Sequence, residues 1–243
     1  MSNQAGMFLS AEWHSLLMLN FEIDPNILQP YLPRGTELDS WHGKTFVSIV
    51  GFRFLYTRLL GIPIPFHRNF DEVNLRFYVR RQADDGLRRG VVFIKEIVPR
   101  WMVSCVARTV YNENYVTRRM RHHVELPTPE SPGRVEYQWK NDGQWNRIAA
   151  TIAGEPILNG SDSEETFITE HYWGYTRQRD GGTAEYQVEH PPWRVWQAGN
   201  VVFDCDVKAL YGAEFATALS QKPSSSFVAE GSAVVVRRGR RID

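Results

Sequence analysis

A chain of 243 residues can form one large domain or two small ones and is long enough to bury a sizeable core. Its 28 Lys and Arg side chains balance 28 Asp and Glu side chains, so no overall field attracts nucleic acid or an anionic membrane. Aromatic residues make up 13% of the chain, which suits a strand-rich fold with large inward side chains.

The N-terminal half predicts a short helix followed by long strands. Asp24 and Pro25 are typical of a helix start, and two further prolines keep the helix within 24–33 short. Residues 45–60 are rich in β-branched and aromatic side chains, which favours a strand. The clearest alternation follows in 70–81, and a turn then leads into the apolar strand 90–100. These two strands are predicted to form an antiparallel hairpin with a long loop.

The C-terminal half continues with strands and a few short helices. Ser161 and Glu164 are typical of a capping box at a helix start, and Pro223 ends a second predicted helix. In chain order we predict a strand over 101–111, a short helix over 112–122, strands over 134–140, 145–153, 181–193 and 201–210, a helix over 210–223 and a last strand over 226–238. Hairpin spacing favours a single domain, 1–243, with a mainly antiparallel β fold that closes on itself.

Motifs for cofactors and metals are missing from the sequence. It contains no glycine-rich nucleotide loop, no GxSxG elbow and no HExxH pair, so we expect neither a cofactor nor a metal ion. A basic stripe or an RNP-type aromatic motif is also missing, so we expect no nucleic-acid partner.

The cysteines and the N-terminal segment indicate the cellular compartment of the protein. Cys105 and Cys205 form no CxxC pair, which is typical of a reduced cytosolic protein. No basic segment precedes a long apolar run at the N-terminus, and no apolar stretch approaches the roughly 20 residues of a membrane span. We therefore predict a cytoplasmic protein that does not bind membranes.

Several segments, among them NFDEVNLRFYVRR, RGVVFIKEIVPR, ARTVYNENYV and VEHPPWRVW, resemble the YqjF-like family of bacterial proteins, a domain of unknown function. The resemblance runs in order from about Glu12 to Val236. The family shares a superfamily with acetoacetate decarboxylase. The resemblance therefore implies a mainly β (α+β) fold, an antiparallel cone-like β-barrel or pair of curved sheets with a few short peripheral helices. Such a fold encloses a cavity for a small molecule.

The resemblance also bears on the decarboxylase's catalytic lysine, which forms a Schiff base and has a lowered pKa. FDEVNLR places Glu72 at the superfamily's acidic position. ARTVYNENYV places Ala107 and Arg108 at its Gly-Arg pair, and Tyr115 and Val116 where the decarboxylase has two lysines. Tyrosine cannot form an imine, so the resemblance implies that ordinary acetoacetate decarboxylation does not occur.

The first hypothesis is a non-covalent pocket, acting either as a binding module or as an enzyme with acid–base groups. Its polar face would come from 70–81, where the side chains of Glu72, Arg76 and Tyr78 alternate with apolar ones. Tyr115 and Arg108 would add a phenol and a guanidinium suited to a carboxylate or carbonyl ligand. The alternative is that the arginines belong to a solvated outer face.

The second hypothesis assigns covalent chemistry to Lys95 in the apolar run 90–100. Burial would lower its pKa and make it a nucleophile toward a keto acid. Regular alternation places Lys95 with Val91 and Phe93, and Glu96 on the other face. Only one of these two charges can then line a cavity. The alternative is a structural ion pair.

The third hypothesis is a non-enzymatic accessory protein whose aromatic clusters fill the core or a homo-oligomer contact. His171 and His190 each follow an acidic residue and could be general bases, but such histidines more often belong to the core or its rim. We favour the first hypothesis and keep the other two as alternatives. Whether the protein is an enzyme, which ligand it binds and its oligomeric state stay open.

Overall fold

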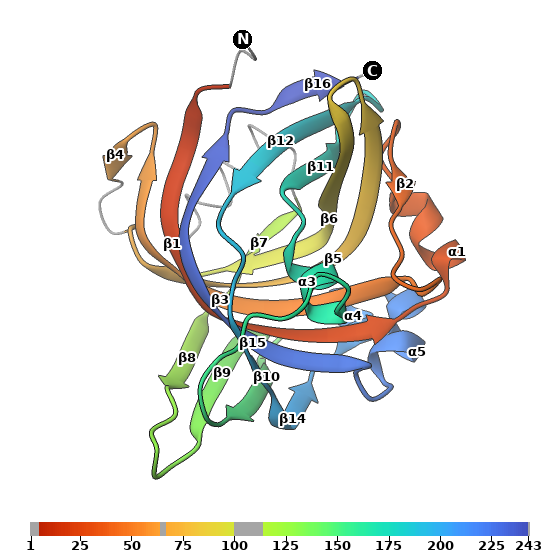
Figure 1. Cartoon of the computed structure of the whole chain (residues 1–243). Coiled ribbons are helices and arrows are strands. Elements are labelled where there is room, and N and C mark those ends of the chain that lie inside the picture. The colour runs from red at the N-terminus through yellow and green to blue at the C-terminus, as the bar shows by residue number, and fades with distance from the viewer. Residues whose placement is uncertain (1–4, 64–66, 100–113, 243) are drawn as a thin grey trace.

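The computed structural model describes residues 5–63, 67–99 and 114–242. These residues form a large curved sheet, a smaller sheet beneath it and a few short helices (Figure 1). No helix within these ranges combines the length and the apolar character that crossing a membrane requires.

The larger sheet closes into a ring. Strand β12 pairs with β11 on one side and with β15 on the other, so the path β15-β1-β3-β5-β6-β11-β12 returns to its start. Neighbours along this path are antiparallel, except β6 and β11, which are parallel. The strands of the path are β1 (Met7–Glu22), β3 (Phe46–Leu59), β5 (Phe70–Ala83), β6 (Gly86–Val98), β11 (Trp173–Arg177), β12 (Thr183–Glu189) and β15 (Ser225–Arg237). Shorter strands on its edges are β2 (Glu37–Leu38), β4 (Ile62–Pro63), β7 (Tyr115–Thr117), β13 (Val195–Gln197) and β16 (Arg240–Ile242). The expected closed, mainly antiparallel β fold is confirmed.

The smaller sheet covers one outer face of the larger one. Its order is β14 (Gly199–Asp204), β10 (Gln144–Ile152), β9 (Gly133–Asn141) and β8 (Met120–Glu125). A Cβ on Gly51 of β3 would lie only 2.7 Å from side-chain atoms of Tyr137 and Ile148, so the close approach of the two sheets there requires a glycine. Apolar side chains of β5 that point to this face, such as Leu75, join the core between the sheets. The alternate residues of β5 therefore point inward.

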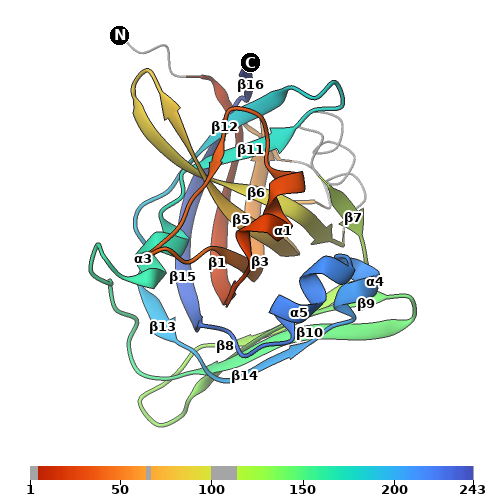
Figure 2. The same cartoon turned by 90° about the vertical axis from the view of Figure 1, so that its right-hand side faces the viewer.

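Short helices occupy the connections. They are α1 (Pro25–Leu28), α3 (Glu164–Thr169), α4 (Val207–Leu210) and α5 (Ala216–Leu219), with 3-10 turns at Gln29–Tyr31 and Ala213–Phe215. Figure 2 shows α4 and α5 above the smaller sheet. Asp24 caps α1 as predicted, because its side chain accepts a hydrogen bond from the backbone of Asn26. The cap of α3 is Ser163 and not Ser161, because the helix begins at Glu164.

Three other predicted elements differ in the structure. The described part of the helix predicted over 112–122 is extended, and its backbone pairs with β6 and β9 as strands β7 and β8. The loop between β5 and β6 is a two-residue turn, since Ala83 pairs with Gly86. The predicted helix over 210–223 is broken into shorter turns. The strand predicted over 201–210 is only half correct, because β14 ends at Asp204 and helix α4 occupies Val207–Leu210. The strand predicted over 101–111 lies outside the described residues, and the other predicted strands are confirmed in their described parts.

A buried carboxylate ties the hairpin to the C-terminus. Glu185 of β12 is 1% exposed and forms ion pairs with Arg81, Arg88 and Arg240. These arginines come from β5, β6 and β16, so one carboxylate joins the strands on both sides of the parallel β6–β11 contact.

Candidate functional site

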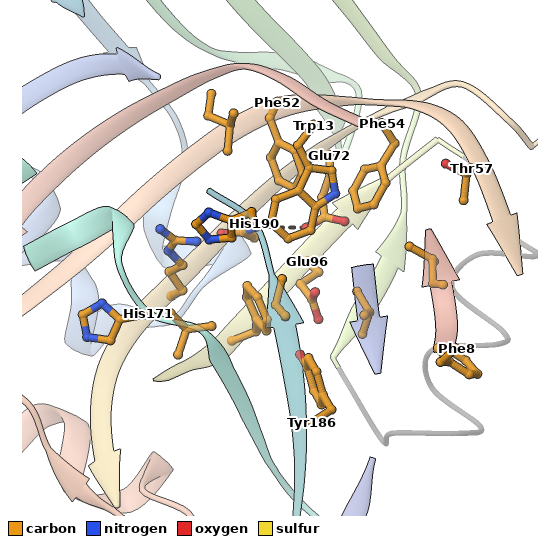
Figure 3. Close-up of a pocket in the computed structure, with 18 of the residues that line it drawn as sticks. Phe8, Trp13, Phe52, Phe54, Thr57, Glu72, Glu96, His171, Tyr186 and His190 are labelled. Atoms are coloured by element: carbon orange, nitrogen blue, oxygen red, sulfur yellow. Dashed lines mark hydrogen bonds between the residues drawn. The ribbon is translucent and has the colours of Figure 1, made fainter. Parts of the chain in front are cut away.

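A cavity of about 170 Å³ lies inside the closed sheet (Figure 3). Its wall comes from β1, β3, β5, β6, β7, β11, β12 and β15, so sheet closure creates it. Most of the wall is apolar and aromatic, and includes Trp13, Phe52, Phe54, Phe93, Trp173 and Trp193. Such a wall suits a ligand with an apolar body and leaves orientation to a few polar groups.

Strand β5 contributes three of these polar groups. Glu72, Asn74 and Arg76 are two residues apart and therefore point to the same face of the sheet. Glu72 is 2% exposed and Asn74 is 1% exposed. The sequence alternation predicted this shared face, and the structure turns it toward the interior of the closed sheet.

Strand β6 departs from regular alternation. Leu75 pairs with Lys95, but the next residue, Arg76, pairs with Phe93, so Ile94 is an extra residue in β6. This β-bulge places Glu96 on the cavity face together with Phe93. Regular alternation grouped Lys95, and not Glu96, with Phe93 and left open which of the two charges faces the cavity. The bulge changes that grouping and turns Glu96 to the cavity.

Lys95 lies on the opposite face of β6. Its ammonium group donates a hydrogen bond to the backbone carbonyl of Leu210, at the end of α4. Burial lowers the pKa of Lys95, and the nearby Arg118 lowers it further. All five lysines of the chain lie within the described residues, and none of them lines the cavity.

The side chains of Glu72 and Glu96 both contact Tyr115 of β7. Glu96 is paired with Asn74 on one side and with Tyr115 on the other, so three neighbouring strands bring these side chains together. The Tyr115 hydroxyl donates to Glu72 Oε2 at 3.2 Å, and the Asn74 amide donates to Glu72 Oε1 at 2.9 Å. Figure 3 shows Glu72 and Glu96 turned toward the same space.

The pKa values of Glu72 and Tyr115 in this cluster are shifted. Burial raises the pKa of Glu72 to about 7, against the lowering effects of the hydrogen bonds from Asn74 and Tyr115 and of the Arg76 charge. Burial also raises the pKa of Tyr115 well above its ordinary value, and the charges of Glu72 and Glu96 and a hydrogen bond with Glu96 add to that shift. Two carboxyl groups close together in a dry site favour a state with one shared proton.

Arg76 contributes a positively charged guanidinium group to the cavity wall. Its Nη2 donates to the carbonyl of Ile168 at 3.4 Å, a long contact. Among the described residues it forms no ion pair, and its buried Nε has no hydrogen-bond partner there. Its guanidinium therefore retains donors for a ligand.

Two neutral histidines also line the cavity. Burial lowers the pKa of His171 to about 4 and that of His190 to about 4, and in both cases the charge of Arg76 adds to the effect. His171 Nε2 lies 3.2 Å from Asp39, whose pKa is lowered to about 2 against burial by its hydrogen bonds to His171 and Arg89. The ring of His190 stacks on Trp193 with 4.0 Å between centroids. Both histidines are thus held in place by protein contacts.

The other predicted ligand contacts lie elsewhere. Tyr78 is fully buried, and its hydroxyl lies 2.6 Å from Ser48 Oγ, outside the cavity wall. Arg108 lies outside the described residues. The aromatic wall from β1, β3 and β12 was not predicted, because only ring closure brings these strands together.

Proteins of known structure share this architecture. The structure resembles acetoacetate decarboxylase from Legionella pneumophila with a TM-score of 0.68 at 12% identity, over 98% of this chain and 88% of that one. It also resembles the enduracididine biosynthesis enzyme MppR complexed with pyruvate, with a TM-score of 0.67 at 11% identity, over 100% of this chain and 92% of that one. The fold is therefore of the acetoacetate decarboxylase-like class.

The sequence comparisons then give the family. The model of the DUF2071 family, described as an uncharacterized conserved protein, matches residues 10–233. The chain is 26% identical over 190 residues to the uncharacterized protein YqjF of Bacillus subtilis, a match that covers 76% of this chain and 74% of that protein. The chain belongs to the DUF2071 family.

Proposed function

We propose that the cavity binds, without a covalent bond, a small molecule that combines a carboxylate with a carbonyl group and an apolar body. The single observation that carries this proposal is that Arg76 lies in a mostly apolar cavity wall and forms no ion pair within the described ranges. A charged donor in such a site is stabilised by an anionic partner, and a guanidinium matches a carboxylate with two parallel hydrogen bonds.

The proposal includes a site that works without a Schiff base. The absence of a lysine from the cavity wall supports this part, as does the Lys95 contact with Leu210 on the other face of β6. The superfamily resemblance supports the carbonyl group of the ligand, since the MppR structure holds pyruvate, a 2-oxo acid. The polar cluster within the wall favours a ligand site over an accessory protein with a wholly apolar interior.

Calorimetric titration with pyruvate and 2-oxobutyrate, and with their methyl esters, tests the proposal. We expect the acids to bind and the esters to bind at least tenfold more weakly, because a charge-assisted hydrogen bond contributes about 1.5–3 kcal/mol. Arg76→Met should lose a similar factor. The matched control is Arg80→Met, because Arg80 follows on the same strand but is exposed and pairs with Glu37 at the surface.

Two outcomes would contradict the proposal. One is an Arg76→Met protein that is folded, judged by its melting temperature, and binds the acids as tightly as the unsubstituted protein. The other is equal affinity for acid and ester, which would leave Arg76 without a role in recognising the ligand.

A further inference from the structure

The cavity holds two carboxyl groups that a binding pocket for an anion does not need. Glu72 and Glu96 are each 2% exposed, and both contact the hydroxyl of Tyr115. A carboxylate repels an anionic ligand, so two carboxyl groups in the same cavity as Arg76 weaken simple anion binding. Their arrangement resembles acid–base pairs, in which one carboxyl group is ionised and its neighbour holds a proton.

A second polar group in the wall also indicates a ligand. Asn74 is 1% exposed and lines the cavity, and its amide nitrogen is committed to Glu72. Its Oδ1 is buried and has no hydrogen-bond partner in the part of the chain that the structure describes. A buried acceptor without a partner costs free energy. A hydroxyl group of a bound molecule, such as that of an enol, would satisfy it.

The ligand's position follows from β5. Arg76 and Glu72 point to the same face of this strand, with Asn74 between them. In a 2-oxo acid the carbonyl carbon is bonded directly to the carboxylate, and the acidic C–H follows on the next carbon. A carboxylate held by Arg76 therefore directs the carbonyl group and the neighbouring carbon along the wall toward Asn74 and Glu72.

We propose that Glu72, Glu96 and Tyr115 catalyse proton transfer at the carbon next to the carbonyl of a 2-oxo acid held by Arg76, so that the site interconverts keto and enol forms. This inference rests on the proposed function. Ionised Glu72 takes the proton from C3, and the C–H electron pair forms the C2=C3 double bond. The carbonyl π pair moves to oxygen, which takes the proton of Glu96.

The step leaves Glu72 protonated and Glu96 ionised, with no net change in charge and no oxidant or reductant. Tyr115 can restore the first state, because its hydroxyl contacts both carboxyl groups. It gives its proton to Glu96 and accepts the proton of Glu72. The elevated pKa of Glu72 makes it a stronger base than an exposed carboxylate, which supports the role.

Proton NMR of 2-oxobutyrate in D₂O tests the inference, since each enolisation replaces a C3 proton by deuterium. We expect the protein to accelerate loss of the C3 signal. Glu72→Gln should lower the protein-dependent rate about 100-fold, within the range for loss of a general base, while calorimetry still detects bound 2-oxobutyrate. Tyr115→Phe should also slow exchange. Glu37→Gln, on the exposed strand β2, is the matched control and should exchange at the unsubstituted rate.

The outcomes separate the two proposals. Binding of 2-oxobutyrate without accelerated exchange overturns the proton transfer and leaves the proposed function standing. Exchange that persists in Glu72→Gln also overturns it. Failure of the unsubstituted protein to bind any 2-oxo acid overturns both.

Discussion

Glu72→Gln should make the folded protein more stable at alkaline pH. In the unsubstituted protein burial raises the pKa of Glu72 from 4.5 to about 7, so the folded state favours the protonated carboxyl group. The stability that this preference contributes is fully present below pH 4.5 and is lost as the pH rises through about 7. Glutamine has a similar shape and does not ionise, so its contribution does not change over this range.

The magnitude follows from the size of the shift. A shift from 4.5 to about 7, at about 1.4 kcal/mol for each pKa unit, corresponds to about 3 kcal/mol. Near pH 4.5 the two proteins should therefore differ little through this site. At pH 8 the free energy of unfolding of Glu72→Gln should exceed that of the unsubstituted protein by up to about 3 kcal/mol. Urea denaturation at several pH values measures both.

Glu37→Gln removes an exposed carboxylate and should change the pH dependence little, since exposed ion pairs contribute at most about 1 kcal/mol. If the stability difference between Glu72→Gln and the unsubstituted protein is the same at pH 5 and pH 8, the carboxyl group ionises normally. The electrostatic description of the cavity would then be wrong.

Three further predictions concern other parts of the molecule. Glu185→Gln should destabilise the fold by about 3–5 kcal/mol in urea denaturation, because it removes the buried carboxylate that pairs with Arg81, Arg88 and Arg240. A loss below 1 kcal/mol would contradict the role in joining strands. Gly51→Ala should cost about 1–3 kcal/mol, because its Cβ would meet Tyr137 and Ile148, and an unchanged melting temperature would contradict the close sheet packing. Treatment with pyruvate and borohydride should leave the protein mass unchanged, whereas a stable adduct at Lys95 would support imine chemistry.

The polar face of the site could be predicted because its signal is local. Alternation over 70–81 is a property of one strand, and it correctly placed Glu72 and Arg76 on the same face. Whether that face points inward depends on how the sheet closes. The closing contact pairs Val188 with Val236, two residues far apart in the sequence, and nothing in either segment identifies the other as its partner.

The choice between Lys95 and Glu96 could not be made from the sequence. It depends on one extra residue, Ile94, whose presence is defined only by the register of β6 against β5. Tyr115 presents a similar case. The predicted helix around it is replaced by a three-residue strand, because β6 offers a free edge for parallel pairing. Tertiary contacts override local preference at both positions.

A crystal structure of the protein with bound 2-oxobutyrate tests the central proposal most directly. The proposal predicts the ligand carboxylate at hydrogen-bond distance, roughly 2.7–3.2 Å, from the guanidinium of Arg76, with no covalent bond to the protein. The proton transfer further requires C3 of the ligand toward Glu72 and its carbonyl oxygen toward Glu96. Density continuous with a lysine side chain would contradict the central proposal, and so would a ligand bound elsewhere beside an empty cavity.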